Sequence, residues 1–199
     1  AVLMACNMSS AVALDEARRR YPGILIAGVI EAGARAAAQQ GRERVGVLAT
    51  AGTVASGAYV RELERAIPGV KVTQTACPDF VPLVESGDLE GPAAVDACRR
   101  YLRPGLDAGA RAFILGCTHY PFLLPALDRV APDGTTFVDP AQETAARALE
   151  QIGCALDRNT PSRFVLTAPS ETFRPVGSRF LGQGIPEPEL AVWTPEGLV

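Results

Sequence analysis

The chain has 199 residues, of which 48% are hydrophobic, and its formal net charge is −3. This composition is typical of a globular protein with a substantial core, and it gives no basic surplus for binding nucleic acid. No apolar run approaches the roughly 20 residues that cross a bilayer, and the apolar beginning lacks the positive flank of a signal peptide. The single lysine, Lys71, lies in an alternating strand pattern, which argues against a Schiff-base enzyme. The single histidine, His119, excludes a multi-histidine metal site within one chain.

The cysteines indicate the redox environment. They are odd in number, widely spaced and form no CxxC pair, which is typical of reduced thiols in a cytoplasmic protein rather than of a disulfide framework. The five are Cys6, Cys77, Cys98, Cys117 and Cys154.

The first half of the chain alternates between strand and helix patterns. It opens inside a strand pattern and without methionine, from which we expect that the natural beginning is missing. A helix over 8–21 ends at a Pro-Gly pair, and the continuous apolar run 24–30 is typical of a strand covered on both faces. The further expected elements are a helix over 34–40, a strand over 44–49, a helix over 54–67, a strand over 70–75, a helical turn over 81–85 and a helix over 91–102.

The second half continues the alternation. A buried strand is expected over 112–116, followed by a helix over 121–130, a short strand over 136–138 and a helix from 139–140 to about 152. A weaker strand over 162–166 precedes a helix over 171–181, for which Ser170 is the candidate N-cap, and the tail after Gly182 is expected to be extended. Strands alternating with helices predict a mostly parallel α/β sheet, arranged in two halves.

Two strand-end cysteines are the main functional signal in the sequence. Cys117 follows the buried strand 112–116, and Cys6 follows the strand pattern at the start of the chain. Ligands of parallel α/β sheets bind beyond the carboxyl ends of the strands, where helix N-termini expose free N–H groups. A thiol in that position is expected to have a lowered pKa.

Two such thiols permit one specific reaction. If they face each other across a cleft, one thiolate can remove the α-proton of a small carboxylic acid while the other thiol protonates the opposite face. That is racemisation by two bases, and it needs no cofactor and no metal. The amide of Asn7 and the hydroxyls of Thr53 and Thr118 are candidates for holding the carboxylate, although each could instead only cap a helix.

Four segments, in this order, carry a family resemblance. They are Ala5-Cys6-Asn7, residues 48–54, residues 77–85 and Gly116-Cys117-Thr118-His119-Tyr120-Pro121. Together they resemble glutamate racemase, of the cofactor-independent aspartate/glutamate racemase superfamily. The resemblance implies interconversion of L- and D-glutamate, with D-glutamate supplied for peptidoglycan. It also implies two flavodoxin-like α/β domains related by a pseudo-two-fold axis, with the active site between them.

The resemblance also assigns residues and boundaries. Cys6 and Cys117 match the catalytic acid/base pair, and His119 matches the histidine beside the second cysteine. Residues that match the family's substrate-binding positions are Asn7, Thr53 and Thr118, with Glu85 as an acidic residue near the histidine. The implied first domain, which carries Cys6, comprises 1–30 plus 138–199, and the second, which carries Cys117, comprises 31–137.

The sequence departs from the family in two places. Methionine stands at position 8, where the family normally has threonine, so one hydrogen bond to the carboxylate is expected to be lost or to be replaced by one from Ser9. The family's upstream Asp-Ser pair and Pro-Tyr-Gly turn do not occur here, so the first domain is expected to be truncated. Two alternatives stay open: a racemase for aspartate or another small acid, and an inactive α/β binding module. The sequence also leaves a homodimer open.

Overall fold

The computed structural model describes residues 1–153 and 161–199. The chain divides into two compact units, Ala1–Cys154 and Ala155–Val199, and each is described by itself. In the described residues, no helix combines the length and the apolar character that crossing a membrane would require.

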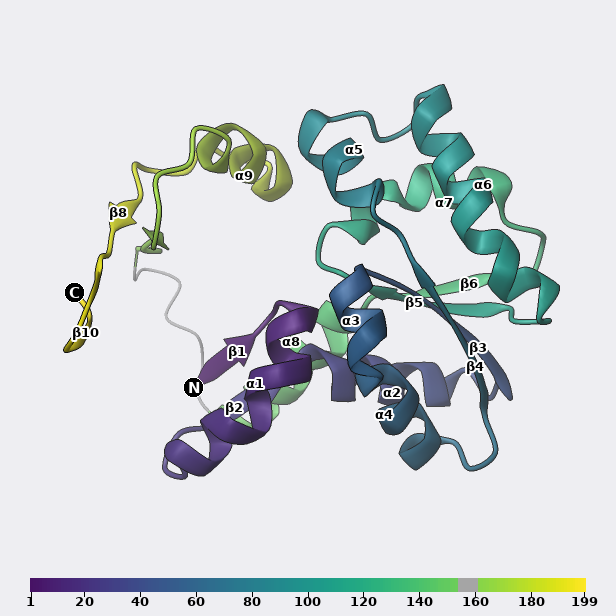
Figure 1. Ribbon diagram of the computed structural model, residues 1–199, viewed down its shortest axis with the longest axis horizontal. Coiled ribbons are helices and arrows are strands. Elements are labelled where there is room, and N and C mark those ends of the chain that lie inside the picture. The colour runs from purple at the N-terminus through teal and green to yellow at the C-terminus, as the bar shows by residue number, and fades with distance from the viewer. Residues whose placement is uncertain (154–160) are drawn as a thin grey trace. The chain divides into compact units, whose positions relative to one another are not determined.

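A small parallel sheet opens the first unit (Figure 1). Strands β1 (Val2–Met4) and β2 (Ile26–Gly28) pair in parallel, and helix α1 (Asn7–Arg20) connects them. The Ser10 hydroxyl donates to the Met4 carbonyl at 2.7 Å and accepts from the Val29 N–H at 3.2 Å. One side chain therefore joins the end of β1, the first turns of α1 and the start of the next helix.

The larger sheet has four parallel strands in the order β4-β3-β5-β6. The strands are β3 (Arg44–Ala49), β4 (Lys71–Ala76), β5 (Ala112–Gly116) and β6 (Thr136–Val138). In their register, Ala49 is paired with both Ala76 and Gly116. Three strands thus end at the same level, and Thr50, Cys77 and Cys117 leave the sheet from one edge.

Helices cover both faces of this sheet (Figure 1). On one face lie α2 (Val29–Gln39) and α4 (Ala58–Ala66), and α3 (Ala51–Ser56) precedes α4. On the other face lie α5 (Phe80–Ser86), α6 (Pro92–Asp107), a 3-10 turn η1 (Tyr120–Leu123) and α7 (Leu124–Val130). Helix α8 (Pro140–Ile152) packs against α2.

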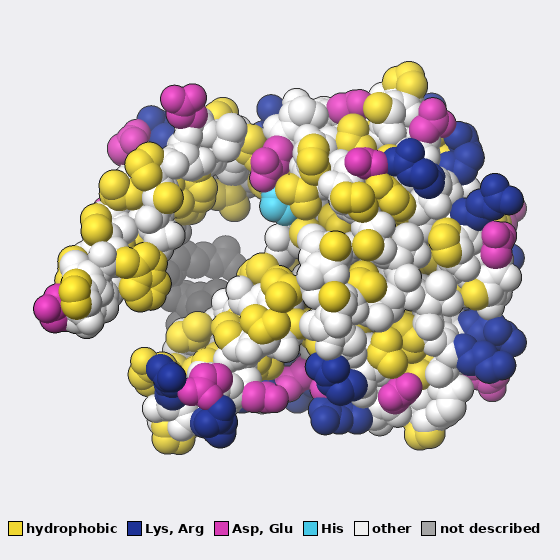
Figure 2. Space-filling view, viewed as in Figure 1, with side chains coloured by type: hydrophobic (Ala, Val, Ile, Leu, Met, Phe, Trp, Pro, Cys, Tyr) yellow, Lys and Arg dark blue, Asp and Glu magenta, His cyan; other side chains and the backbone are white. Residues whose placement is uncertain are grey.

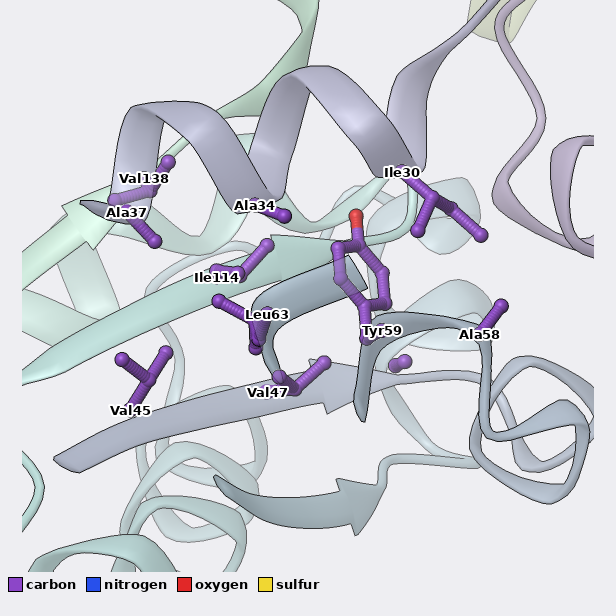
Figure 3. Close-up of a cluster of buried hydrophobic side chains, with 11 residues drawn as sticks. Ile30, Ala34, Ala37, Val45, Val47, Ala58, Tyr59, Leu63, Ile114 and Val138 are labelled. Atoms are coloured by element: carbon purple, nitrogen blue, oxygen red, sulfur yellow. The ribbon is translucent and has the colours of Figure 1, made fainter. Parts of the chain in front are cut away.

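The core under α2 and α4 is fully apolar apart from one phenol (Figure 3). Val45, Val47 and Ile114 point from the strands toward Ala34 and Leu63, and all are at most 1% exposed. The period of two along β3 and β5 places these side chains on one face of the sheet. Tyr59 joins the same cluster and is completely buried.

The Phe113 ring packs on the opposite face of the sheet, in space that side chains at two neighbouring glycines would otherwise occupy. It is the cross-strand partner of Gly46, and a Cβ atom at Gly46 would lie 2.3 Å from its ring. A Cβ atom at Gly105 of α6 would lie 2.5 Å from the same ring. Both glycines are therefore required by close packing, and α6 approaches the sheet over this ring.

The second unit contains short elements. Strands β7 (Val165–Leu166) and β8 (Glu189–Leu190) pair in parallel, and β9 (Trp193–Thr194) and β10 (Gly197–Leu198) form an antiparallel pair. Helix α9 spans Phe173–Leu181. The Ser170 hydroxyl accepts from the Phe173 N–H at 3.1 Å, so it satisfies a helix donor although Thr172 is the N-cap residue.

The α/β fold with parallel sheets is confirmed, with differences in the bounds of several elements. The strand expected over 24–30 is limited to Ile26–Gly28, because Val29 and Ile30 are the buried start of α2. An apolar run does not distinguish a buried strand from a buried helix turn.

The helix expected over 54–67 is broken at Gly57, which has a φ of 64°. Helix α6 continues to Asp107 through Pro104, and the tail contains short strands. The predicted boundaries at 30 and 138 stay a prediction, and Cys154 lies outside the described residues.

Candidate active site

Cys6 lies at the N-cap of α1. Its backbone is extended (φ −75°, ψ 125°), its carbonyl accepts from the Ser10 N–H at 2.9 Å, and the residue is exposed. Partial burial of the thiol opposes its ionisation, but the backbone and hydroxyl of Ser9 and the backbone of Met8 outweigh this, and the pKa of Cys6 is lowered. The free donors of a helix start therefore stabilise a thiolate at this position, as the sequence predicts.

Cys117 follows β5 directly and is half-buried. Burial is the main cause that raises the pKa of this thiol, and the nearby charge of Cys6 raises it further. The backbone N–H groups of His119 and Thr118 and the Thr118 hydroxyl act in the opposite direction but do not prevail. The expectation of a lowered pKa is therefore wrong for Cys117, because desolvation outweighs the donors.

The two thiols are thus electrostatically coupled and biased in opposite directions. Cys6 lies close enough to Cys117 for its charge to oppose the ionisation of the second thiol. Like charges that share a site favour a state with one proton between the two groups. The surroundings therefore favour the thiolate at Cys6 over the thiolate at Cys117.

His119 stands between Cys117 and a carboxylate. Its Nδ1 lies 3.8 Å from the Cys117 Sγ, and its Nε2 lies 3.2 Å from Oε1 of Glu85 on α5. A carboxylate on one ring nitrogen fixes the orientation and tautomer of the imidazole. Glu85 therefore leaves Nδ1 facing the sulphur, where it can exchange a proton with the thiol.

A cavity of about 170 Å³ lies beside Cys117. It is mostly apolar, and Asn7, Cys117 and Thr118 are the members of the predicted site that line it. The N-terminus of α8 closes it with Asp139 and Pro140, and the Asp139 Oδ1 accepts from the Ala141 N–H at 2.9 Å. The cavity therefore combines one thiol with an amide and a hydroxyl, whereas Cys6 and His119 are not among the residues that line it.

Thr53 takes a different position from the other predicted ligands. It is completely buried in α3, and its Oγ1 lies 3.0 Å from Oγ1 of Thr50. Neither residue lines the cavity, whereas Thr118 is exposed at its rim. Thr118 and Asn7 are therefore the predicted ligand groups that a molecule in this cavity would meet first.

A second cavity, of about 420 Å³, lies along β2. Its charged lining residues are Arg18, Glu31, Arg35 and Arg147, and no cysteine or histidine is among its walls. Arg18 and Glu31 form a bidentate ion pair with distances of 2.7 and 3.0 Å. The cavity along β2 thus lacks the thiol and the imidazole of the predicted site, so the smaller cavity is the candidate site.

The comparison with known proteins identifies the family. A model of the Asp/Glu/hydantoin racemase family matches residues 1–148. The chain belongs to the Asp/Glu/hydantoin racemase family.

Individual members of the family agree with this. A glutamate racemase of Gloeobacter violaceus is 46% identical over 162 residues, which are 81% of this chain and 58% of that protein. A glutamate racemase of Synechocystis is 38% identical, over 91% of this chain and 66% of that protein. The crystal structure of glutamate racemase from Francisella tularensis in complex with D-glutamate superposes with a TM-score of 0.84 at 28% identity, over 98% of this chain and 73% of that one. The chain thus spans about three fifths to two thirds of the length of these two curated relatives.

Met8, where the family normally has threonine, makes a packing contact between two helices. Met8 lies in the first turn of α1, and its sulphur packs over Gly52, where a Cβ atom would be only 3.0 Å away. The thioether therefore makes an apolar contact between α1 and α3 and offers no hydrogen bond to an acid. Ser9 supplies the hydroxyl in this turn, and it acts on the Cys6 thiol.

Sequence reasoning did not single out two residues that the structure places at or beside the candidate site. Asp139 follows β6 at the carboxyl edge of the same sheet, so the rule that identified Cys117 also applies to it. Tyr59 gave no such signal, because an aromatic residue on the apolar side of a helix is most often only a core residue.

On the face that Figure 2 shows, basic and acidic side chains are interspersed and form no basic patch.

Proposed function

We propose that this chain carries the acid/base pair of a glutamate racemase, with Cys6 and Cys117 as the two catalytic groups. The observation that supports this most is the opposite bias of the two coupled thiols. A two-base racemase must begin each turnover with one base deprotonated and the other protonated. The opposite pKa shifts favour this assignment, with Cys6 as the thiolate and Cys117 as the thiol.

The proposed step is a proton transfer across the α-carbon. The Cys6 thiolate removes the α-proton from one face of the amino acid, and the electron pair passes into the adjacent carboxylate. The Cys117 thiol then delivers its proton to the opposite face. The product has inverted configuration, Cys6 is left as a thiol and Cys117 as a thiolate. After product release Cys6 loses a proton to solvent and Cys117 gains one from solvent, which restores the first state.

Five further residues act on this step in the proposal. His119 exchanges a proton with Cys117, and Glu85 holds the histidine ring in place. Asn7 and Thr118 donate to the α-carboxylate, which gains charge as the α-proton leaves. Thr53 supports the site from within α3, behind its contact with Thr50.

Glutamate is the proposed substrate, with D-glutamate for peptidoglycan as the product and a cytoplasmic location. Support comes from the curated relatives, which are glutamate racemases, and from the Francisella enzyme in complex with D-glutamate. The match to a large share of this chain includes both cysteine segments, because it covers residues 1–148.

The finer architecture belongs to the same proposal. We place Cys6 and Cys117 in two flavodoxin-like α/β domains related by a pseudo-two-fold axis, with boundaries near 30 and 138. The sheet β1–β2 lies within 1–30 and the sheet β3–β6 within 44–138, which supports a division near residue 30.

The test follows loss of optical activity and isotope uptake together. The reduced chain is incubated with L-glutamate in deuterium oxide, circular dichroism records the decay of rotation, and mass spectrometry records deuterium at the α-carbon. We expect both signals to proceed together, and L-aspartate to give neither. Unchanged rotation and no deuterium uptake, with the protein folded by far-UV circular dichroism, would contradict the proposal. If L-aspartate reacted faster than L-glutamate, the substrate would be aspartate or another small acid instead of glutamate.

A further inference from the structure

Tyr59 is a polar group placed inside an apolar core. Its ring is completely buried among Ile30, Ala34 and Leu63, and its hydroxyl points toward the helix that carries Ile30 and Ala34 (Figure 3). That hydroxyl donates to the side-chain oxygen Oδ1 of Asn7 at 2.6 Å. The hydrogen bond therefore connects α4, which packs on the large sheet, to the residue that follows Cys6.

The ring of Tyr59 is held on two sides by glycines. A Cβ atom at Gly116 would lie 3.0 Å from Cε2 of the ring, and a Cβ atom at Gly33 would lie 3.2 Å from the hydroxyl. Gly116 is the last residue of β5 and immediately precedes Cys117. The phenol thus occupies a fixed position between the two cysteine segments, in space that ordinary side chains at these glycines would fill.

The phenol is also kept protonated. Burial is the main cause that raises its pKa, and the negative charges of Asp139 and Cys117 act in the same direction. A neutral phenol retains its proton and can donate it in a hydrogen bond. The acceptor in this structure is the carbonyl end of the Asn7 amide.

This hydrogen bond decides which end of the Asn7 amide a ligand meets. Asn7 is 5% exposed and lines the cavity that contains Cys117. Its oxygen is engaged by the phenol, and among residues 1–153 its NH₂ group has no hydrogen-bond partner. A rotation of the amide by half a turn would instead present an oxygen to the ligand, which would repel a carboxylate.

We propose that Tyr59 is a positioning residue that locks the Asn7 amide with its NH₂ group toward the cavity, where that group binds the carboxylate of the amino-acid substrate. The inference rests on the proposed function for the identity of the acid. It adds a residue that does not touch the substrate and that acts through Asn7.

The first experiment compares steady-state kinetics of Tyr59→Phe and Tyr101→Phe. The phenylalanine keeps the ring and removes the hydroxyl, and loss of one oriented donor predicts a KM for glutamate raised about tenfold. Because the carboxylate gains further charge as the α-proton leaves, kcat should fall as well, and by no more than KM rises. Tyr101 of α6 is the matched control, because its hydroxyl donates to Asp79 at 2.5 Å. Tyr101→Phe should retain the parental kcat and KM. A Tyr59→Phe enzyme with parental KM would overturn the proposal.

A double-mutant cycle separates positioning from general support of the core. In an Asn7→Ala background the amide is absent, so Tyr59→Phe should raise KM no further. If Tyr59 only supports packing, the two losses should instead add, and additive losses would therefore contradict the inference.

The second experiment reads the amide directly and does not depend on turnover. Asn7 and Asn159 are the two asparagines of the chain, so selective ¹⁵N-asparagine labelling gives two side-chain NH₂ pairs, and Asn7→Ala assigns them. We expect Tyr59→Phe to shift the Asn7 pair and to weaken its response to added glutamate about tenfold. An Asn7 pair that Tyr59→Phe leaves unmoved would refute the lock. A parental chain whose Asn7 pair ignores glutamate would refute the proposed function, while the shift in the variant would still test the lock.

Discussion

Oε1 of Glu85 lies 3.2 Å from Nε2 of His119. The carboxylate comes from α5, and the histidine comes from the turn after Cys117, so two segments of the sequence meet at one imidazole ring. The ring faces the Cys117 sulphur with its other nitrogen, at 3.8 Å. Glu85 therefore contacts the Cys117 sulphur only through His119, and we expect it to act by orienting the imidazole ring.

Replacement of Glu85 tests this. We expect Glu85→Ala to lower kcat about tenfold with KM nearly unchanged, because the ring loses its partner while the substrate contacts remain. Glu85→Gln retains an acceptor oxygen and should lose less. Glu64→Ala, at an exposed glutamate of α4, is the control. A raised KM in Glu85→Ala would instead place this carboxylate against the substrate.

Single replacement of the catalytic thiols should separate the two proton transfers. Cys6→Ser and Cys117→Ser should each lower racemisation about 10³-fold, because a hydroxyl is a far weaker base than a thiolate. Each variant can retain exchange of the α-proton on the face that still has a thiol. Deuterium incorporation without loss of rotation would identify such one-sided exchange. Cys98→Ala, at a buried thiol of α6, should keep the parental rate, and either serine variant racemising at that rate would exclude its thiol as a base.

The opposite bias of the thiols predicts an order of alkylation by iodoacetamide. The rate follows the thiolate fraction, so Cys6, whose pKa is lowered, should reach half of its maximal rate at a lower pH than Cys117, whose pKa is raised. In Cys6→Ser the neighbouring charge is gone, so the Cys117 midpoint should move to lower pH. Peptide mass spectrometry in a Cys154→Ser background measures both sites. An unchanged Cys117 midpoint in Cys6→Ser would contradict the coupling.

The packing of Phe113 predicts a large difference between two glycine substitutions. Gly46→Ala would place a methyl group 2.3 Å from the Phe113 ring and should lower the free energy of unfolding, by about 1–3 kcal/mol. At Gly23 no atom lies within 4 Å of the added Cβ, so Gly23→Ala should stay within about 0.5 kcal/mol of the parent. Urea unfolding measures both. Equal stability of the two variants would mean that the ring relaxes freely.

The sequence predicts the strands of the large sheet well, because their apolar runs end at clear turn signals. Residues 44–49, 112–116 and 136–138 form strands as expected. The errors lie where a local signal has two structural solutions. Val29 and Ile30 are apolar in either a strand or a helix, and only their packing shows that they begin α2. Gly57 interrupts a helical pattern that is otherwise continuous.

The site is predictable where it depends on strand ends and not where it depends on burial. Cys6 and Cys117 share one local layout, yet their pKa values move in opposite directions, because Cys117 is desolvated and lies near a second thiol. Neither effect has a signature in the flanking residues. Tyr59 and Asn7 are separated by 52 positions in the chain, and their hydrogen bond depends on the tertiary fold.

The shared register of β3, β4 and β5 has a consequence for protein engineering. Because Ala49, Ala76 and Gly116 lie side by side, the next residue of each strand starts from an equivalent platform. Thr50, Cys77 and Cys117 are therefore three equivalent positions for a reactive side chain, and they differ in the residues that pack over them. Moving a nucleophile from one position to another would leave the sheet unchanged and alter only the distance between the nucleophile and the bound acid. This edge of the sheet is therefore suited to the engineering of a new specificity.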